Sequence, residues 1–315
     1  MAKKNNSNKK TDNKKIDDKK KDNKKTIVIV IACVIISASV LSITFTMDYV
    51  TLPETSPTIS DYIENLSVTH TALVQTTPYF HAYLTPDDDN RIKENFAHVD
   101  GIRLTLNEST AEQIIDYLKP NNNSVVIFPV FTAAAYHEPG FYTYFRGDCD
   151  ESCITDLSFE TFNFGFGGSG GTAQILYYVG YDFLTDIEVD KNPELLQNYD
   201  TVILLHNEYV TKKEFDAISN HPNLIFLHPN ALYAEIDVNY DDNTMTLIRG
   251  HQYPPPENPA NGFDYAIEQE FHHYEYDTKC ENWEFIEIEN GFHLNCYPES
   301  IIIENFEILK KMKEL

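Results

Sequence analysis

The chain has 315 residues, of which 49 are acidic and only 24 are basic, so its formal net charge at pH 7 is −25. The first 25 residues hold 11 Lys and 4 Asp, a local charge of +7, and subtracting this tail leaves −32 on residues 26–315. A surface that acidic repels nucleic acids and anionic headgroups, which excludes both as partners of the folded region. It suits a soluble domain that faces salt water or cations.

Two segments precede the folded region. Residues 1–25 contain almost no apolar side chain and are expected to form a disordered basic tail. Residues 26–47, TIVIVIACVIISASVLSITFTM, have no ionisable side chain except Cys33 and would span roughly 33 Å as a helix, enough for a bilayer core of about 30 Å.

Lysines flank only the N-terminal side of this apolar segment. The positive-inside rule therefore predicts a single-pass protein of the cell membrane with a cytoplasmic N-terminus and an extracytoplasmic C-terminal domain. Its first partner is then the lipid bilayer, through residues 26–47. A signal peptide cleaved near Ser37 or Ser39 is the alternative.

Residues 48–77 are expected to form a stalk, and residues 78–315 the extracytoplasmic domain. Ser109 and Glu112 have the spacing of a capping box, and apolar side chains at positions 111, 114, 115 and 118 predict an amphipathic helix. The apolar run 125–131 predicts a buried strand whose hydrogen-bonded part ends at Pro129.

The stretch 132–172 is long, irregular and rich in aromatic side chains, which is typical of a functional loop. A helix over 173–179, a strand over 183–189 and a short helix over 193–198 are expected next.

The chain is organised around residues 199–232. Residues 202–205 and 224–227 are short apolar runs that predict buried strands. Between them, Thr211 and Glu214 form a capping box for a helix that ends near Asn220. Strand, helix and strand in this space predict a parallel pair with a right-handed crossover.

Hairpins are expected beyond residue 232. Residues 234–239 and 245–249 alternate around a turn, and residues 283–288 and 292–296 flank Asn290-Gly291, a strong hairpin signal. A helix over 300–315 follows. The sequence thus predicts an α/β domain with a flavodoxin-like parallel sheet, helices on both faces and antiparallel hairpin extensions, after one N-terminal transmembrane helix.

Two motifs carry a resemblance to a known family: DTVILLHNEY, from Asp200 to Tyr209, and HPNALY at residues 228–233. They resemble the class I glutamine amidotransferase-like fold. The likeness is to its divergent branch, which holds the C-terminal domain of the N,N-dimethylformamidase β-subunit and the ThuA-like proteins, as in membrane-anchored archaeal surface proteins. It covers roughly residues 124–240. Amidotransferases proper carry a nucleophilic Cys after this last strand, but the matching place is Asn230-Ala231, which speaks against glutaminase chemistry.

Polar side chains follow the predicted parallel strands. Ligands bind at the carboxyl ends of such strands, so we expect a crevice there. The candidate crevice residues are Tyr136, His137, Glu138, His206, Asn207, Glu208, Tyr209, His228 and Asn230. Imidazoles and carboxylates are what a divalent cation or an acid–base pair requires, so a divalent cation is the one cofactor that the cluster suggests. Alternatively, these polar side chains have no function in binding and only cap the following helices or form hydrogen bonds within the loops.

Four cysteines lie beyond the apolar segment, and an even number in an oxidising compartment favours disulfides. We expect Cys149 to pair with Cys153 and Cys280 with Cys296; a four-thiolate zinc site is the alternative.

Three N-x-S sequons predict a glycoprotein. They begin at Asn65, Asn107 and Asn122.

Two further motifs have ordinary explanations. Residues 165–170 fit G-x-G-x-x-G, with Asp186 or Glu188 about twenty residues on, but a mobile glycine-rich loop is the expected structure. Asp237-x-Asn239-x-Asp241 begins like a calcium loop, but it lacks the later Gly and Glu and predicts a hairpin turn.

Two functions from different classes follow. The first is a cell-surface domain without catalysis that binds a small ligand, a glycan or another envelope protein. The second is a hydrolase of amide or glycosidic bonds that uses His206, Glu208 and His228, with or without a metal. A nucleotide-dependent oxidoreductase is a third hypothesis, tied to the glycine-rich motif.

Overall fold

The structure is a computed structural model of the chain, and it describes residues 58–63, 72–84, 101–159, 164–263 and 279–315. Two compact units divide the chain, Met1–Thr55 and Ser56–Leu315, and every described residue belongs to the second. The expected tail, the expected membrane helix and Asn65 lie outside the described residues. Among the helices that are described, none is both long and apolar enough to span a bilayer.

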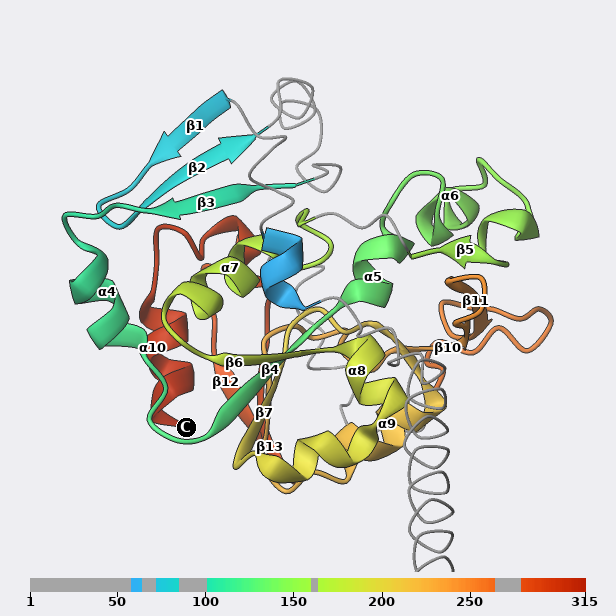
Figure 1. Cartoon of the computed structure of the whole chain (residues 1–315). Helices are drawn as coiled ribbons and strands as arrows, with labels where there is room; N and C mark the ends of the chain where they lie inside the picture. The colour runs from blue at the N-terminus through green and yellow to red at the C-terminus, as the bar shows by residue number, and fades with distance from the viewer. Residues whose placement is uncertain (1–57, 64–71, 85–100, 160–163, 264–278) are drawn as a thin grey trace, which may run out of the picture. The chain divides into compact units, whose positions relative to one another are not determined.

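A six-stranded sheet forms the centre of the described fold (Figure 1). Its strands, in spatial order, are β12 (Phe285–Ile288), β13 (Gly291–Leu294), β9 (Leu224–Phe226), β7 (Thr201–Leu204), β4 (Ser124–Phe128) and β6 (Asp182–Thr185). All neighbours are parallel except the β12–β13 hairpin. Leu204 pairs with Phe226, so the two strands of the predicted strand–helix–strand unit are parallel neighbours, as expected.

The sheet is buried on both faces because its central strands are unbroken apolar runs. All residues of β4 and β7 are buried. Side chains alternate along a strand, so Val126 and Phe128 belong to one core cluster, while Val125 and Ile127 belong to the other. The sheet therefore needs a cover on each side.

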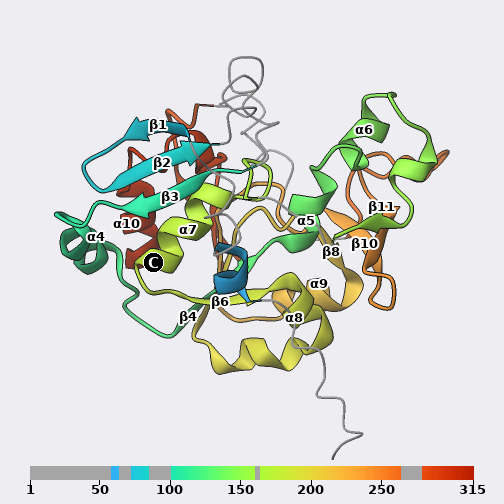
Figure 2. The same cartoon turned by 45° about the horizontal axis from the view of Figure 1, so that its top comes forward.

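Helices supply both covers, which confirms a mixed α/β domain with a parallel sheet (Figures 1 and 2). The first core cluster includes buried residues of α4 (Ala111–Leu118), α7 (Gly170–Tyr178) and α10 (Glu307–Glu314). The second includes those of α8 (Asp186–Lys191), the 3-10 helix η3 (Pro193–Asn198) and α9 (Lys212–Ser219).

Two helices begin with capping boxes. The Thr211 hydroxyl accepts from the N–H of Glu214 at the start of α9, as the sequence predicts. The Thr185 hydroxyl accepts from the N–H of Glu188 at the start of α8, which the sequence analysis missed. The expected strand over 183–189 is therefore wrong beyond Thr185, where the chain turns into α8.

The capping box predicted at Ser109 is also wrong. α4 begins after Thr110, and the Ser109 hydroxyl instead donates to Oδ1 of Asn107. Asn and Ser side chains often form such local turns in place of a cap. The amphipathic helix itself is present, with Ile114 and Leu118 buried.

Replacing Thr185 with Ala is expected to lower the free energy of unfolding by about 1 kcal/mol, because the first turn of α8 loses its cap. Ser109→Ala is the matched control and should change the stability by less than about 0.5 kcal/mol, since Ser109 caps nothing. Urea unfolding of both variants measures the difference; equal losses would show that the Thr185 hydroxyl does not act as a cap.

Two smaller sheets extend the fold. One is antiparallel, with β1 (Ala72–Thr76), β2 (Phe80–Leu84) and β3 (Arg103–Leu106). The other has the order β5 (Leu157–Ser158), β11 (Thr244–Arg249), β10 (Ala234–Asn239) and β8 (Tyr209–Thr211). Both predicted hairpins, β10–β11 and β12–β13, are confirmed. The short strand β8, which pairs in parallel with β10, was not foreseen.

Part of the expected stalk belongs to the folded domain. Within 48–77, residues 59–63 are helical, and Ile59, Tyr62 and Ile63 are buried in the first core cluster. Strand β1 also lies in that range. Likewise, the expected loop over 132–172 contains the last four residues of α5 (Val130–Ala135) and the whole of α6 (Phe141–Phe145).

The two predicted disulfides are present, Cys149–Cys153 and Cys280–Cys296. Such bonds are typical of an oxidising compartment, in agreement with an extracellular domain.

Two of the three sequon asparagines lie in the described part of the chain. Asn122 is in the exposed turn before β4, where its Nδ2 donates to the Thr201 hydroxyl. Asn107 is half-buried and precedes α4.

Candidate functional site

The polar residues that follow β7 are buried. His206, Asn207 and Glu208 lie between β7 and β8, and they are 2%, 0% and 0% exposed. Tyr209, the first residue of β8, is buried as well. A carboxylate with no exposure must be compensated by nearby donors, because burying an uncompensated charge is costly.

Four side chains compensate Glu208. Its Oε2 accepts from the Tyr136 hydroxyl at 2.9 Å, and its Oε1 accepts from the Tyr142 hydroxyl at 3.2 Å. Nε2 of His251 lies 2.6 Å from Oε1, and Nε2 of His206 lies 3.0 Å from Oε2. Burial raises the pKa of Glu208, but His251 and His206 outweigh burial and hold it well below its usual value. Glu208 is therefore ionised at neutral pH.

His206 is held from both sides. Its Nδ1 lies 2.6 Å from the carbonyl oxygen of Gly167, which can only accept, so Nδ1 carries a proton. Nε2 lies close to Glu208 without the alignment of a hydrogen bond. The ring stacks on His228 at 3.6 Å between centroids, and Tyr297 contacts both rings.

The structure brings only some of the predicted residues together. His206, Glu208 and His228 lie in one cluster, and the N–H of Asn230 donates to Nδ1 of His228. His137 is exposed and so does not join the buried histidines. Glu138 is exposed too and forms an ion pair with Arg146. The predicted convergence of His137 and Glu138 with this cluster is wrong, because α5 ends at Ala135 and both residues lie in the turn beyond it.

Asn207 is an unusual member of the cluster. Its side chain is fully buried, and neither Nδ2 nor Oδ1 has a hydrogen-bond partner within the described part of the chain. Buried amides normally find partners, so the Asn207 amide at the carboxyl end of β7 stands out from the usual pattern.

Sequence reasoning missed two central residues, Tyr142 and His251. Tyr142 lies on α6, inside the stretch taken for a loop. His251 follows β11 and has a positive φ of 52°, as does Gln252 with 66°. Such backbone costs about 1–3 kcal/mol per residue and is concentrated at functional sites, but no sequence pattern indicates it.

Aromatic rings surround His251. The ring of Tyr233 lies at 4.6 Å, that of Phe145 at 5.0 Å and that of Tyr209 at 5.6 Å between centroids. His251 is 19% exposed, and its Nδ1 has no partner among the described residues. The site thus reaches the surface at this imidazole.

Three oxygens of the site form a triangle. The hydroxyls of Tyr136 and Tyr142 lie 2.7 Å apart, and each is 2.9 to 3.3 Å from a carboxylate oxygen of Glu208. Oxygens that ligate one ion at about 2.0–2.1 Å in an octahedron are about 2.9 Å apart. The hydrogen bonds among the three side chains account for these distances, which also match the edge lengths of an oxygen-ligated metal site. No group of three His, Cys, Asp or Glu within the described residues is placed to hold a metal.

The glycine-rich motif does not form a dinucleotide site. It leads into α7, as expected, but the N-terminus of α7 is occupied by the chain's own Glu299, which accepts from the N–H groups of Gly171 at 2.9 Å and Thr172 at 2.8 Å. A phosphate would compete with this carboxylate for the same donors. Residues 160–163 lie outside the described part, and the described strand that precedes the motif, β5, belongs to the smaller sheet.

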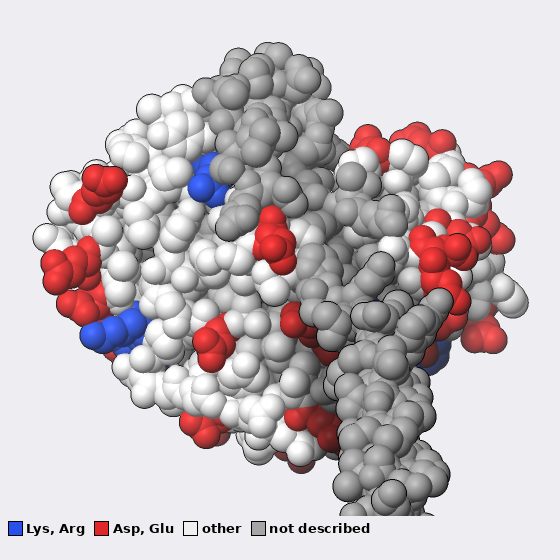
Figure 3. All heavy atoms as spheres, in the orientation of Figure 1, with Lys and Arg blue, Asp and Glu red and all other residues white. Residues whose placement is uncertain are grey.

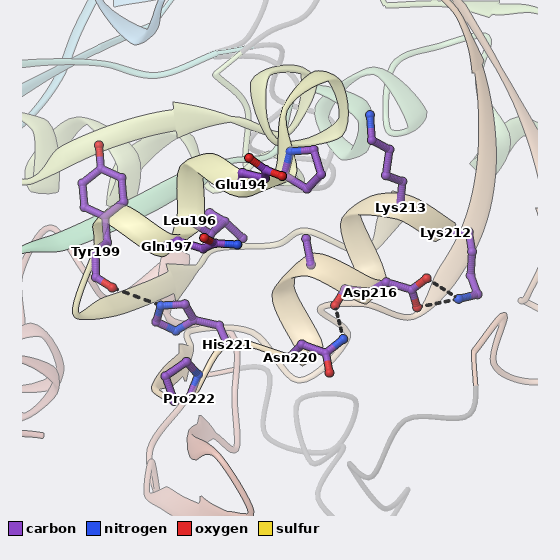
Figure 4. A pocket seen from close by; sticks show the side chains of 12 residues that line it. Glu194, Leu196, Gln197, Tyr199, Lys212, Lys213, Asp216, Asn220, His221 and Pro222 are labelled. Carbon is purple, nitrogen blue, oxygen red and sulfur yellow. Dashed lines mark hydrogen bonds and ion pairs between the residues drawn. The ribbon is translucent and has the colours of Figure 1, made fainter.

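A groove of about 840 Å³ lies away from this site, between η3 and α9 (Figure 4). Leu196 and Ala217 are among the residues that line it, as is the exposed Lys212–Asp216 pair. The groove contains none of the candidate crevice residues. Because its walls precede the amino ends of β7 and β9, it is not the crevice that the sequence predicts.

A comparison of the chain with models of protein families and with curated proteins finds no match. The site is therefore interpreted from its own geometry.

Proposed function

We propose that this chain is a membrane-anchored, extracytoplasmic hydrolase of amide bonds with a metal site on Tyr136, Tyr142 and Glu208. The observation that carries the proposal is the oxygen triangle of these three residues, together with the partly exposed imidazole beside it. It corresponds to the second of the two functions that the sequence suggests, with Tyr136, Tyr142 and His251 added to the site.

The position of the site in the sheet supports the proposal. In chain order the five parallel strands are arranged 2-1-3-4-5, the order of flavodoxin-like sheets. Ligands in such sheets bind where the order reverses, which here is between β4 and β7. Tyr136 follows β4 and Glu208 follows β7. The same topology is compatible with the divergent amidotransferase-like branch that the sequence resembles, without its usual nucleophile.

The donor set suits a hard cation. Phenol and carboxylate oxygens favour hard metal ions, and a bound cation lowers the pKa of its ligands, so the two phenols can bind as phenolates. Such an ion would polarise an amide carbonyl and activate water, which replaces the missing Cys or Ser nucleophile.

The surface around the site favours uncharged or cationic substrates. Acidic side chains gather on the lobe that carries α6, β5 and β11 (Figure 3). Exposed members of this set are Glu138, Asp148, Asp150, Glu151, Asp156, Asp237, Asp241 and Asp242. An acidic rim repels anions and concentrates cations. Neutral and basic amides therefore suit the site better than acidic ones.

Elemental analysis of the purified full chain tests the proposal. The wild type is expected to hold about one transition-metal ion and to hydrolyse small neutral amides. Replacing both Tyr136 and Tyr142 with Phe should remove the metal and lower the activity by roughly 100-fold or more. Tyr144→Phe is the matched control, because Tyr144 lies on the same helix and contacts Phe145 and Tyr253 instead. A wild type that binds no metal after incubation with iron, manganese or zinc salts would refute the proposal.

The aromatic rings around His251 favour a second candidate, a surface domain that binds a glycan or a neighbouring envelope protein. Partly exposed Tyr and Phe rings are common binding platforms. In that case the Glu208 network would only hold the platform rigid, and glycan binding without metal or hydrolysis would be observed.

A further inference from the structure

The C-terminal strap, defined here as Cys296 to Glu299, ties the glycine-rich loop 164–171 in place. The Tyr297 hydroxyl donates to the carbonyl oxygen of Phe166 and lies 3.2 Å from the N–H of Ser169. Two residues further on, Glu299 accepts from Gly171 and Thr172, including the Thr172 hydroxyl. Cys296 anchors the strap through its disulfide with Cys280.

The loop in turn holds His206. Nδ1 of His206 lies against the carbonyl oxygen of Gly167, and the backbone N–H of His206 donates to the Ser169 hydroxyl at 3.1 Å. Gly167 itself is packed so closely on Tyr136 that a Cβ there would lie 2.5 Å from the ring. A change in how the strap grips the loop therefore reaches both His206 and Tyr136.

We propose that Glu299 is a positioning residue whose carboxyl group, by gaining or losing a proton, sets how firmly the strap holds the loop behind His206. The inference goes beyond the proposed hydrolase, because it concerns a switch built into the fold and stands whether or not the site is catalytic.

The surroundings of Glu299 explain why its proton matters. The side chain is 6% exposed. The groups that face it are the N–H of Gly171, the N–H and hydroxyl of Thr172 and, on its own segment, the phenol of Tyr297. No cation among the described residues contributes to its titration. Burial outweighs the three donors and raises the pKa of Glu299 to about 7.

The direction of the effect follows from this shift. The closed strap binds a proton more tightly than an open, solvated strap, in which the pKa of Glu299 returns to its ordinary value of 4.5. The closed arrangement of strap and loop is therefore most stable below pH 4.5 and becomes less stable as the pH rises through 7. Between pH 5 and pH 7 the equilibrium constant for opening should increase by roughly 40-fold.

Hydrogen exchange of the full chain in detergent tests the proposal, with rates corrected for intrinsic exchange. Peptides from 164–178 and 296–306 should open more at pH 7 than at pH 5 in the wild type, by the factor above. In Glu299→Gln, which keeps the shape but cannot ionise, this difference should vanish. Peptides of the β10–β11 hairpin, which belongs to a different sheet from β13, the strand that leads into the strap, are the internal control. The same pH dependence in both proteins would overturn the switch.

A second readout separates positioning from simple stability. The ¹⁵N signals of His206 should follow the titration of Glu299 in the wild type but not in Glu299→Gln. If the loop opens with pH while His206 does not respond, the positioning role is refuted. Should Glu299→Gln fail to fold, Tyr297→Phe replaces it. This variant loses the hydrogen bond from the Tyr297 hydroxyl to the loop but keeps the carboxyl group of Glu299. Hydrogen exchange in the loop must then be faster than in the wild type and must still depend on pH.

Discussion

Glu208→Ala is expected to lower the free energy of unfolding by about 3–5 kcal/mol. The substitution removes the acceptor of two tyrosine hydroxyls and leaves His206, which is 2% exposed, beside an empty space. Breaking a buried, hydrogen-bonded charge set in this way is among the most costly single changes. Chemical denaturation at pH 7 measures the loss.

The control for Glu208 is Asp216→Ala. Asp216 also pairs with a cation, Lys212, but both side chains are more than half exposed, so water and salt screen the pair. Its loss should cost less than about 1 kcal/mol. A Glu208 variant as mild as this control would mean that the four donors are satisfied equally well by water.

The pH dependence of the Glu208 contribution has a defined sign. Because the pKa of Glu208 is lowered by His251 and His206 against the effect of burial, the folded state binds its proton more weakly than the unfolded state. The stabilisation is thus complete above the ordinary pKa of 4.5 and is lost only as the pH falls well below it. The difference between wild type and Glu208→Ala should shrink only in strong acid.

Glu214→Gln is expected to make the protein more stable than the wild type at pH 8 and no more stable at pH 4. Burial raises the pKa of Glu214 well above its usual value, and neighbouring Asp186 and Asp190 add to the rise. The folded state therefore holds a proton that the unfolded state releases, and the wild type loses stability as the pH rises, by about 1.4 kcal/mol per pH unit for each such proton. Glutamine has no proton to lose.

The geometry around Glu214 explains why this proton is kept. Glu214 Oε2 accepts from the N–H of Thr211, whereas Oε1 is buried and has no partner among the described residues. Asp186 is also fully buried, where it accepts from the N–H groups of Phe131 and Ile187, and burial raises its pKa as well. The two carboxyls thus share one low-dielectric region.

Urea unfolding between pH 4 and pH 8.5 checks the prediction for Glu214, with Glu194→Gln as an exposed control. The slope of stability against pH should be smaller in Glu214→Gln than in the wild type and unchanged in the control. If the stability of all three proteins changed with pH by the same amount, Glu214 would not hold a proton in the folded state.

Most of the sheet could be predicted from the sequence because the patterns that indicate its strands and turns lie within short segments of the chain. Short apolar runs such as Val202 to Leu205 indicate buried strands, and the Asn290-Gly291 turn indicates the last hairpin. The capping box at Thr211 is confirmed, yet the similar pattern at Ser109 is not, because Asn107 competes for the Ser109 side chain. A short motif predicts a structure only when no neighbour offers a better bond.

The candidate site was predicted less completely, since it depends on contacts between distant parts of the chain. His206 and Glu208 were found because they follow a recognisable strand. Tyr142 and His251 reach Glu208 from segments 66 and 43 residues away, on an irregular stretch and a strained turn. The glycine-rich motif was correctly taken as a loop, but its partner Glu299, 128 residues beyond Gly171, could not be inferred from spacing.

The position of β13 has a consequence for how the protein reaches its final state. β13 is the parallel partner of β9, and it comes late in the chain, after both smaller sheets. Until residues 291–294 have been delivered, one edge of β9 stays open, and open edges of apolar strands invite pairing between chains. A chain whose synthesis stops before this point should therefore aggregate, whereas a chain that includes residues 291–294 closes this edge of its own sheet.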